Sequence, residues 1–420
     1  MSGEKLVNRW IMVVAAVVMQ MCLGVLYAWS VFRPALMDID PDAWTIQAAG
    51  YPYMFSILFF AIGTIVAGRW QDRVGPRKVA LVGAFLLALG AALSGAFGPG
   101  SPVVMVITYG VVAGLGVGFA YVTPIATCVK WFPDKRGAIT GIAVFGFGAG
   151  TLVFAPVINA LITAVGVSGT LYILAGAFLV LVGGAALVFR VPPEGYCPVG
   201  WTPPVTDAGS AQVDYTTGEM FRTRQFWTLW IIYFFGAGAG LAVIGQAVPI
   251  GQDLAGLEVS VAASGLGIMA LFNGLGRLAW GALSDRLGRM RTIMLMFVGM
   301  IIAFLAVLPF ASGFILWLVG MCLVGFCFGG YLAVMPTISA DFFGTKNLGA
   351  NYGFLFLAYG TSGVAAPFLM GALRESTGNY SVAMYIFAGL AVVSILLALT
   401  VKAPSARVLP VKAVAEPEEA

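Results

Sequence analysis

The stretch GRWQDRVGPRK at residues 68–78 returns as GALSDRLGR at residues 281–289, a shift of 213 positions. A second landmark repeats at almost the same distance, because Pro124 in one apolar run corresponds to Pro336 in another, 212 positions later. Both charged stretches lie between apolar runs. The chain therefore contains two copies of one unit, and each copy has the same charged loop at the same point.

Composition assigns the chain to the membrane. Of its 420 residues, 60% are hydrophobic and 10% charged, with a mean hydropathy of +0.97, whereas soluble domains have about a quarter of their residues charged. The apolar residues gather in runs of about 20, the length that a helix needs to cross a bilayer. We therefore exclude a water-soluble globular protein and predict an all-α membrane protein of two pseudo-symmetric six-helix bundles. Its twelve predicted spans are 10–32, 46–68, 79–97, 103–129, 137–163, 169–190, 225–248, 260–284, 291–311, 313–339, 348–372 and 380–401.

The distribution of lysine and arginine predicts the orientation. Of the 22 basic residues, 19 fall on the side of both termini, two (Arg33 and Arg374) on the opposite side and one inside a span. Basic loops stay in the cytoplasm, so we expect cytoplasmic termini and a multi-pass protein of the cell inner (plasma) membrane. The first span has no small-residue cleavage pattern, so we predict an anchored helix and not a removable signal.

The repeat also predicts the domain organisation. We expect an N-terminal six-helix bundle at 1–190, a cytoplasmic linker rich in proline and acidic residues at 191–224, a C-terminal bundle at 225–403 and a cytoplasmic tail at 404–420. Two bundles in the same orientation are typical of carriers in which a central site is exposed to each side in turn.

Several motifs carry a family resemblance. The paired loops resemble those of the major facilitator superfamily, and the likeness covers the whole chain. Four further motifs resemble the oxalate:formate antiporter group, which is related to the monocarboxylate transporters: YAWS at 27–30, WFPDKRG at 131–137, GEMFRT at 218–223 with QFW at 225–227, and NYG at 351–353. The resemblance implies the major facilitator fold, secondary transport and a small organic carboxylate as substrate.

The charged loops are candidate gates. Asp72 and Asp285 can accept hydrogen bonds from a neighbouring helix end or from arginine partners, with Arg73 and Arg286 beside them. Breaking such contacts would bias the protein between inward and outward states, a role that the resemblance favours for Asp72. The alternative is a solvated basic loop that only fixes the topology.

Arg277 is the one charge well inside a predicted span, because all 18 acidic residues fall in loops, tails or span ends. An arginine there costs about 2.5–3.5 kcal/mol on insertion scales, and such a charge normally faces a cavity or a partner. A guanidinium can give a carboxylate two parallel hydrogen bonds, so Arg277 is the predicted anion ligand. The alternatives are snorkelling to the interface or hydrogen bonds to backbone carbonyls.

Asn273 lies one helical turn before Arg277, on the same face. Its amide can donate to a carboxylate or a substrate hydroxyl; the alternative is an interhelical hydrogen bond. Monocarboxylate transporters that couple to protons typically have an aspartate at this position. The resemblance therefore favours proton symport, whereas the asparagine favours carboxylate exchange, and the sequence leaves both open.

Aromatic residues are the predicted walls of the site. By helix rise, Tyr121, Phe328 and Tyr331 lie at about the depth of Arg277, and Tyr27, Tyr233 and Tyr385 are looser candidates. The resemblance supports Tyr27 and Tyr121, since aligned tyrosines belong to the site of the antiporter. The alternative for each is packing or a place in the interfacial belt.

Tyr359 predicts the charge of the substrate. The resemblance aligns it with an intramembrane lysine of the antiporter, where two cations neutralise a dianion. With one cation left, an unpaired second carboxylate in low dielectric would cost several kcal/mol. We therefore predict a monoanion, and an aromatic cage favours hydroxy and keto acids over formate.

The remaining composition excludes much chemistry. The chain has no histidine, and its five cysteines form no C-x-x-C pair, so we predict no metal site, no cofactor and no disulfide framework. We expect no enzyme, no nucleic-acid partner and a monomer in the lipid bilayer. The predicted function is proton-coupled transport of lactate- or pyruvate-like monocarboxylates by alternating access; the alternatives are an oxalate:formate-type exchanger and a carboxylate sensor that does not transport.

Overall fold

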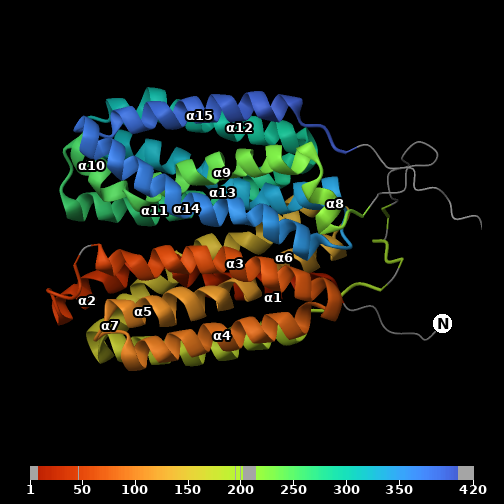
Figure 1. Ribbon diagram of the computed structural model, residues 1–420, viewed down its shortest axis with the longest axis horizontal. Helices are drawn as coiled ribbons and strands as arrows, with labels where there is room; N and C mark the ends of the chain where they lie inside the picture. Colours follow the sequence, from red (N-terminus) through yellow and green to blue (C-terminus); the bar gives the residue numbers. More distant parts are fainter. Residues whose placement is uncertain (1–7, 46, 194, 199, 202–213, 405–420) are drawn as a thin grey trace, which may run out of the picture.

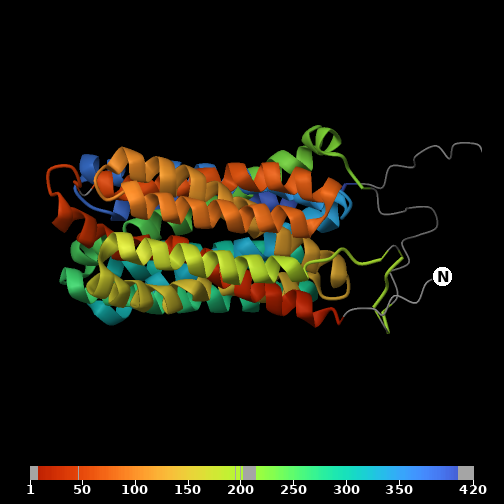
Figure 2. The same ribbon diagram turned by 90° about the horizontal axis from the view of Figure 1, so that it is seen from below.

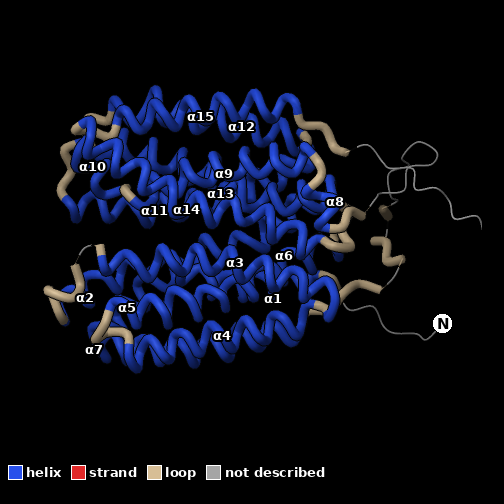
Figure 3. The backbone as a smooth tube through the Cα atoms, viewed as in Figure 1, coloured by secondary structure: helices blue, strands red, loops and turns tan. Residues whose placement is uncertain are grey.

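The computed structural model describes residues 8–45, 47–193, 195–198, 200–201 and 214–404. Within these ranges the regular secondary structure is helical, and no strand occurs (Figure 3). Of the predicted tail 404–420, only Pro404 is described, and residues 202–213 of the predicted linker lie outside the described residues.

The first half of the chain forms six membrane crossings. α7 is a 53-residue run that joins two helices across Gly166, whose φ of 71° no helix allows. This kink separates the predicted spans 137–163 and 169–190. The elements are α1 (Trp10–Leu23), η1 (Gly24–Val31), α2 (Phe32–Ile39), η2 (Ala48–Gly50), α3 (Tyr51–Val74), α4 (Pro76–Phe97), α5 (Pro102–Met105), η3 (Val106–Ala113), α6 (Gly114–Trp131) and α7 (Arg136–Val188).

The second half forms six more crossings. Eleven described helices are long and apolar enough to cross a membrane, and the kink in α7 divides one of them, so the prediction of twelve spans is confirmed. The elements are α8 (Thr217–Phe221), α9 (Arg224–Gly245), α10 (Ala247–Ala255), α11 (Val259–Leu287), α12 (Arg289–Ile302), η4 (Ala303–Val307), η5 (Leu308–Phe310), α13 (Phe314–Phe343), α14 (Leu348–Thr377) and α15 (Ser381–Thr400).

The two sets of helices lie side by side as two layers (Figures 1 and 2). The start of α1 and the end of α15 lie at the same end of the molecule, which we name the terminal end; the opposite end is the far end. The charged loops after α3 and α11 turn at the terminal end through Gly75 and Gly288, with φ of 86° and 87°. Only glycine adopts such φ values readily, so both charged loops depend on glycine for their tight turns.

Glycines bring the halves together at the terminal end. Gly68 of α3 contacts the backbone of Gly349 of α14 so closely that a Cβ on Gly68 has no room. Gly137 of α7 and Gly281 of α11 make the corresponding contact on the other side. The halves are therefore joined along α3 with α14 and α7 with α11, and the terminal end is closed.

The outer surface is apolar and the cysteines are mostly internal. Large hydrophobic side chains such as Phe85, Val180 and Leu399 are more than half exposed on the outside of the bundle, as lipid-facing residues are. Four of the five cysteines are buried, and Cys197, in the segment after α7, is exposed.

Candidate functional site

Arg277 lies fully buried on α11, at the contact between the halves. Its Nε donates to Oδ1 of Asn273 at 3.1 Å, and its Nη1 donates to the backbone oxygen of Val144 in α7 at 3.0 Å. Its Nη2 has no hydrogen-bond partner. The side chain therefore does not snorkel to the interface, and the N–H groups of Nη2 remain for another group.

The charge of Arg277 has no counter-ion among the described residues. Its two partners are neutral, and none of the ion pairs in the described ranges includes it. The guanidinium carbon lies 5.5 Å from the ring centre of Phe147, and a ring face offsets only a part of a buried charge. The predicted hydrogen bond to a backbone carbonyl is present, yet the charge itself is unpaired.

The side-chain amide of Asn273 binds Arg277 and the backbone of a neighbouring helix. Its Oδ1 accepts from Arg277, and its Nδ2 donates to the backbone oxygen of Gly325 at 3.2 Å. Both ends of the amide are thus used inside the second half. Asn273 thus makes the interhelical hydrogen bond considered for it and positions Arg277, and its direct contact with a substrate stays a prediction.

Aromatic rings from both halves surround Phe356 of α14. The ring centres of Phe60, Tyr121 and Tyr352 lie 4.9, 5.0 and 5.6 Å from it, and that of Tyr233 lies at 6.3 Å. The cluster joins α3 and α6 of the first half to α9 and α14 of the second. Both halves therefore contribute rings to one aromatic cluster.

Tyr359 is the second link between the halves in this cluster. Its hydroxyl shares a hydrogen bond of 2.5 Å with the hydroxyl of Tyr27. Its ring stacks on Phe356 at 4.7 Å and on Phe328 at 6.3 Å. The structure thus brings together four predicted residues, Tyr27, Tyr121, Phe328 and Tyr359.

Three tyrosine hydroxyls of this cluster lack hydrogen-bond partners. The guanidinium of Arg277 lies near the hydroxyls of Tyr27, Tyr121, Tyr233 and Tyr359. The hydroxyls of Tyr121, Tyr233 and Tyr352 lie near one another, yet none of the three makes a hydrogen bond. Buried polar groups normally have partners, so a polar ligand would satisfy this group.

Two predicted residues lie elsewhere. Tyr331 packs against Phe297 of α12 and Gly236 of α9, inside the second half. Tyr385 is 50% exposed on α15. Helix rise predicts how deep a residue such as Tyr331 lies, but it does not say which face of the helix points to the centre.

The sequence reasoning missed Phe60, Phe147, Tyr352 and Phe356. Tyr352 lies within the NYG motif, and Phe356 follows one turn later on the same helix face. The spacing from Tyr352 through Phe356 to Tyr359 was the available signal. Phe60 and Phe147 lie in apolar runs with nothing to distinguish them.

Asp72 reaches across the halves at the terminal end. Its two carboxylate oxygens accept from the backbone N–H groups of Gly349 and Ala350, at 3.2 and 2.8 Å. These N–H groups open α14, where the helix dipole favours negative charge. Lys130 lies 3.6 Å from the same carboxylate.

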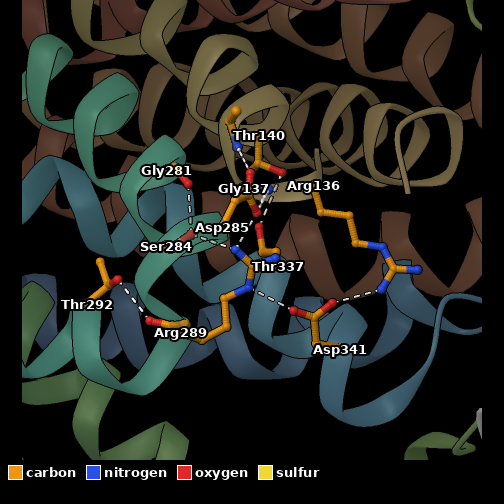
Figure 4. A network of polar contacts seen from close by, with 12 residues as sticks. Arg136, Gly137, Thr140, Gly281, Ser284, Asp285, Arg289, Thr292, Thr337 and Asp341 are labelled. Atoms are coloured by element: carbon orange, nitrogen blue, oxygen red, sulfur yellow. Dashed lines mark hydrogen bonds and ion pairs between the residues drawn. The ribbon is translucent and has the colours of Figure 1, made fainter. Parts of the chain in front are cut away.

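Asp285 makes the mirror contact. It accepts from the N–H groups of Gly137 and Ala138, which open α7, at 2.9 and 2.8 Å. Figure 4 shows Arg289 between Asp285 and Asp341, at 2.6 and 2.8 Å, with Arg136 of the first half 2.8 Å from Asp341. We call the contacts of Asp72 and Asp285 with these N–H pairs the gate.

Arg73 and Arg286 do not take part in the gate. Both residues are exposed, and neither takes part in the ion pairs found among the described residues. The gating roles of these two arginines stay a prediction. The positive charges beside the acidic residues come instead from Lys130, which pairs with Asp72, from Arg289, which pairs with Asp285, and from Arg136, which pairs with Asp341 across the halves.

The comparisons agree with this geometry. Residues 9–316 and 256–418 match the sequence profile of the Major Facilitator Superfamily. The chain belongs to the major facilitator superfamily. It is therefore a multi-pass membrane transporter by family, and the resemblance stated from the motifs is confirmed.

Known members of the superfamily are similar over most of their length. The oxalate:formate antiporter of Oxalobacter formigenes is 32% identical over 377 residues, which cover 88% of this chain and 86% of the antiporter. The apicoplast pyruvate carrier 1 of Toxoplasma gondii is 26% identical over 82% of this chain and 72% of the carrier. The solved structure of the proton:xylose symporter XylE, bound to 6-bromo-6-deoxy-D-glucose, has a TM-score of 0.68 at 14% identity and covers 92% of this chain and 94% of that chain; this likeness concerns the fold alone.

Proposed function

We propose that this superfamily member is a secondary transporter of small monocarboxylates of the lactate and pyruvate class, and not an enzyme. The bundles 1–190 and 225–403 rock about a central site, with both termini in the cytoplasm and the protein in the plasma membrane. One observation carries the proposal: the buried charge of Arg277 has a free Nη2 donor and no counter-ion among the described residues. A substrate carboxylate supplies that counter-ion.

The count of cations supports a monoanion. The position that the antiporter group fills with lysine is Tyr359 here, and its hydroxyl already pairs with the hydroxyl of Tyr27. A second carboxylate would have no cation at this place, and burying an unpaired charge is costly. The site therefore suits one carboxylate and one neutral polar group.

The proposed class of substrate can be tested by thermal stabilisation. We expect lactate and pyruvate to raise the unfolding temperature of the purified protein, because a ligand that binds only the folded state stabilises it. Oxalate at equal concentration should raise it much less. Stabilisation by oxalate but not by lactate would overturn the charge argument.

We propose proton symport as the mode of coupling, on the likeness to the monocarboxylate transporters. Exchange is the second candidate, favoured by one observation: position 273 is an asparagine and no carboxylate pairs with Arg277 among the described residues. Uptake of labelled lactate into proteoliposomes separates the two. Symport predicts stimulation by an inward proton gradient without internal lactate, exchange predicts stimulation by internal lactate alone, and no uptake under any condition indicates a sensor.

The unpartnered tyrosine hydroxyls predict selectivity for a second oxygen. We expect Tyr352→Phe to weaken lactate binding about three- to tenfold, the effect of one hydrogen bond, and to leave propionate, which lacks the hydroxyl, unchanged. Competition against labelled lactate measures both. Tyr331→Phe is the matched control, since it removes an equally buried and unpartnered hydroxyl outside the cluster. Equal losses for lactate and propionate would contradict the role of Tyr352.

A further inference from the structure

The two halves of the gate occupy matched positions in the repeat. The N–H groups that receive Asp285 belong to residues 137 and 138, and those that receive Asp72 belong to residues 349 and 350. Both pairs are related by a shift of 212. We name residues 132–138 and 344–350 the gate loops, because each ends on the N–H pair that the opposite half binds.

The first gate loop is held by the segment that leads into the first half. Arg9, just before α1, makes two hydrogen bonds to the carboxylate of Asp134, at 2.7 and 3.1 Å. Its guanidinium carbon also lies 4.3 Å from the ring centre of Phe132. Trp10 packs edge-on against the same ring at 5.2 Å. Three residues before the first receiving N–H group, the loop is thus tied down by a bidentate ion pair.

The second gate loop is held by the segment that leads into the second half. Asp214 accepts from the N–H group of Lys346 at 3.0 Å, again three residues before the first receiving N–H group. The backbone of Tyr215 donates to Phe343 at 2.9 Å and accepts from the side chains of Asn347 and Asn351, each at 3.0 Å. The segment therefore follows the loop from its first residue to the start of α14.

Local chemistry keeps this second segment in shape. Thr216 and Glu219 form a capping box at the start of α8, which fixes the chain direction. Thr217 donates to Asn351 at 3.1 Å, and Phe221 packs on Phe354 of α14 at 4.9 Å. Arg69 of the first half lies over the same Phe354 ring, at 4.7 Å. The linker motif GEMFRT and the α14 motif NYG thus meet in one contact.

We infer that the lead-in segment of each half is a strut of the gate, and that Arg9 and Asp214 are positioning residues that hold the receiving N–H groups in place. The shift of 212 that relates residues 137 and 349 also relates residues 134 and 346, so both struts hold the same point of the loop although their sequences differ. A pair of N–H groups binds a carboxylate only at fixed geometry. Releasing the strut frees the loop, weakens the contact with the opposite aspartate and favours opening of the terminal end.

The inference is tested by the accessibility of the closed end. Thr337 of α13 is fully buried and lies 3.5 Å from Thr140 of the first half. In a variant whose five cysteines are replaced, Thr337→Cys is reached by a charged thiol reagent only when the halves separate at the terminal end. We expect Arg9→Ala and Asp214→Ala each to raise the labelling rate about fivefold, since each loses the charge-assisted hydrogen bonds that hold its gate loop.

Each strut should act through one aspartate only. Arg9→Ala should add nothing to the labelling rate of Asp285→Asn but should add to that of Asp72→Asn, and Asp214→Ala should show the reverse pattern. Arg374→Ala is the matched control, because it breaks an arginine–aspartate pair of the far end (Arg374 with Asp253, 3.2 Å) and should leave labelling unchanged.

Other outcomes overturn the inference. If Arg9→Ala lowers the unfolding temperature but labelling stays at the parent rate, the segment is only structural. The same conclusion follows if Arg9→Ala adds to the labelling rates of both Asp72→Asn and Asp285→Asn. If Arg9→Ala does not fold, Arg9→Lys and Thr217→Val are used instead. The inference fails if both of these variants are labelled at the parent rate. None of these measurements depends on the identity of the substrate.

Discussion

Arg277→Ala should abolish uptake of lactate and remove its thermal stabilisation. The affinity should fall about thirtyfold to several thousandfold, since truncating one member of a buried hydrogen-bonded charge pair costs about 2–5 kcal/mol. Arg277→Lys should not restore it. Lysine places one charge at the end of a flexible stem, whereas the guanidinium is held by Asn273 and Val144 through two nitrogens and offers the third.

The matched control for this loss is Arg374→Ala, which removes an arginine from the far end. It should bind lactate as the parent does. Because Arg277 is buried without a counter-ion, Arg277→Ala should also fold well and should unfold at a temperature equal to or above that of the ligand-free parent. Binding of lactate by Arg277→Ala at parental affinity would refute the proposed site.

Gly68→Ala should trap the carrier with its terminal end open. The added methyl group meets the backbone of Gly349 and Ala350 across the contact between the halves, and backbone cannot move aside as a flexible side chain can. Overpacking of this kind costs about 1–3 kcal/mol, so the ratio of closed to open molecules falls about fivefold to 150-fold. Labelling of Thr337→Cys should rise accordingly, and uptake should fall.

Gly183→Ala is the control for this substitution. Gly183 lies in the second helix of α7, and a Cβ built there meets no neighbouring atom within 4 Å. It should transport and label as the parent does. If Gly68→Ala also labels at the parent rate, close contact at Gly68 does not limit closure, and the gate would have to depend on Asp72 and Asp285 alone.

The sequence predicted the fold well because membrane spans are read from the length of apolar runs. The break at Gly166 was predicted from the interruption between residues 163 and 169. The linker was less predictable, since α8 is only five residues long and depends on its contact with α14. Short helices held by tertiary contacts leave little periodicity in a sequence.

The site was predicted in part. Arg277 was identified because a charge in an apolar run has a large energetic cost, and that cost does not depend on its neighbours. Tyr331 and Phe328, three residues apart on α13, show the limit: both pack on α9, yet Tyr331 also contacts Phe297 of α12, and only Phe328 joins Tyr359. The same limit applies to the gate. Asp285 pairs with Arg289 and not with Arg286, and Asp72 pairs with Lys130 and not with Arg73.

The positions of the cysteines allow transport to be measured separately for each orientation of the protein in a vesicle. Cys197 is the exposed cysteine of the five, and it follows α7 on the side where that helix ends. An impermeant fluorescent maleimide added outside vesicles would therefore react with molecules inserted in one direction and spare those inserted in the other. The unmodified protein carries its own reporter of sidedness after reconstitution, so initial rates can be normalised to correctly oriented copies.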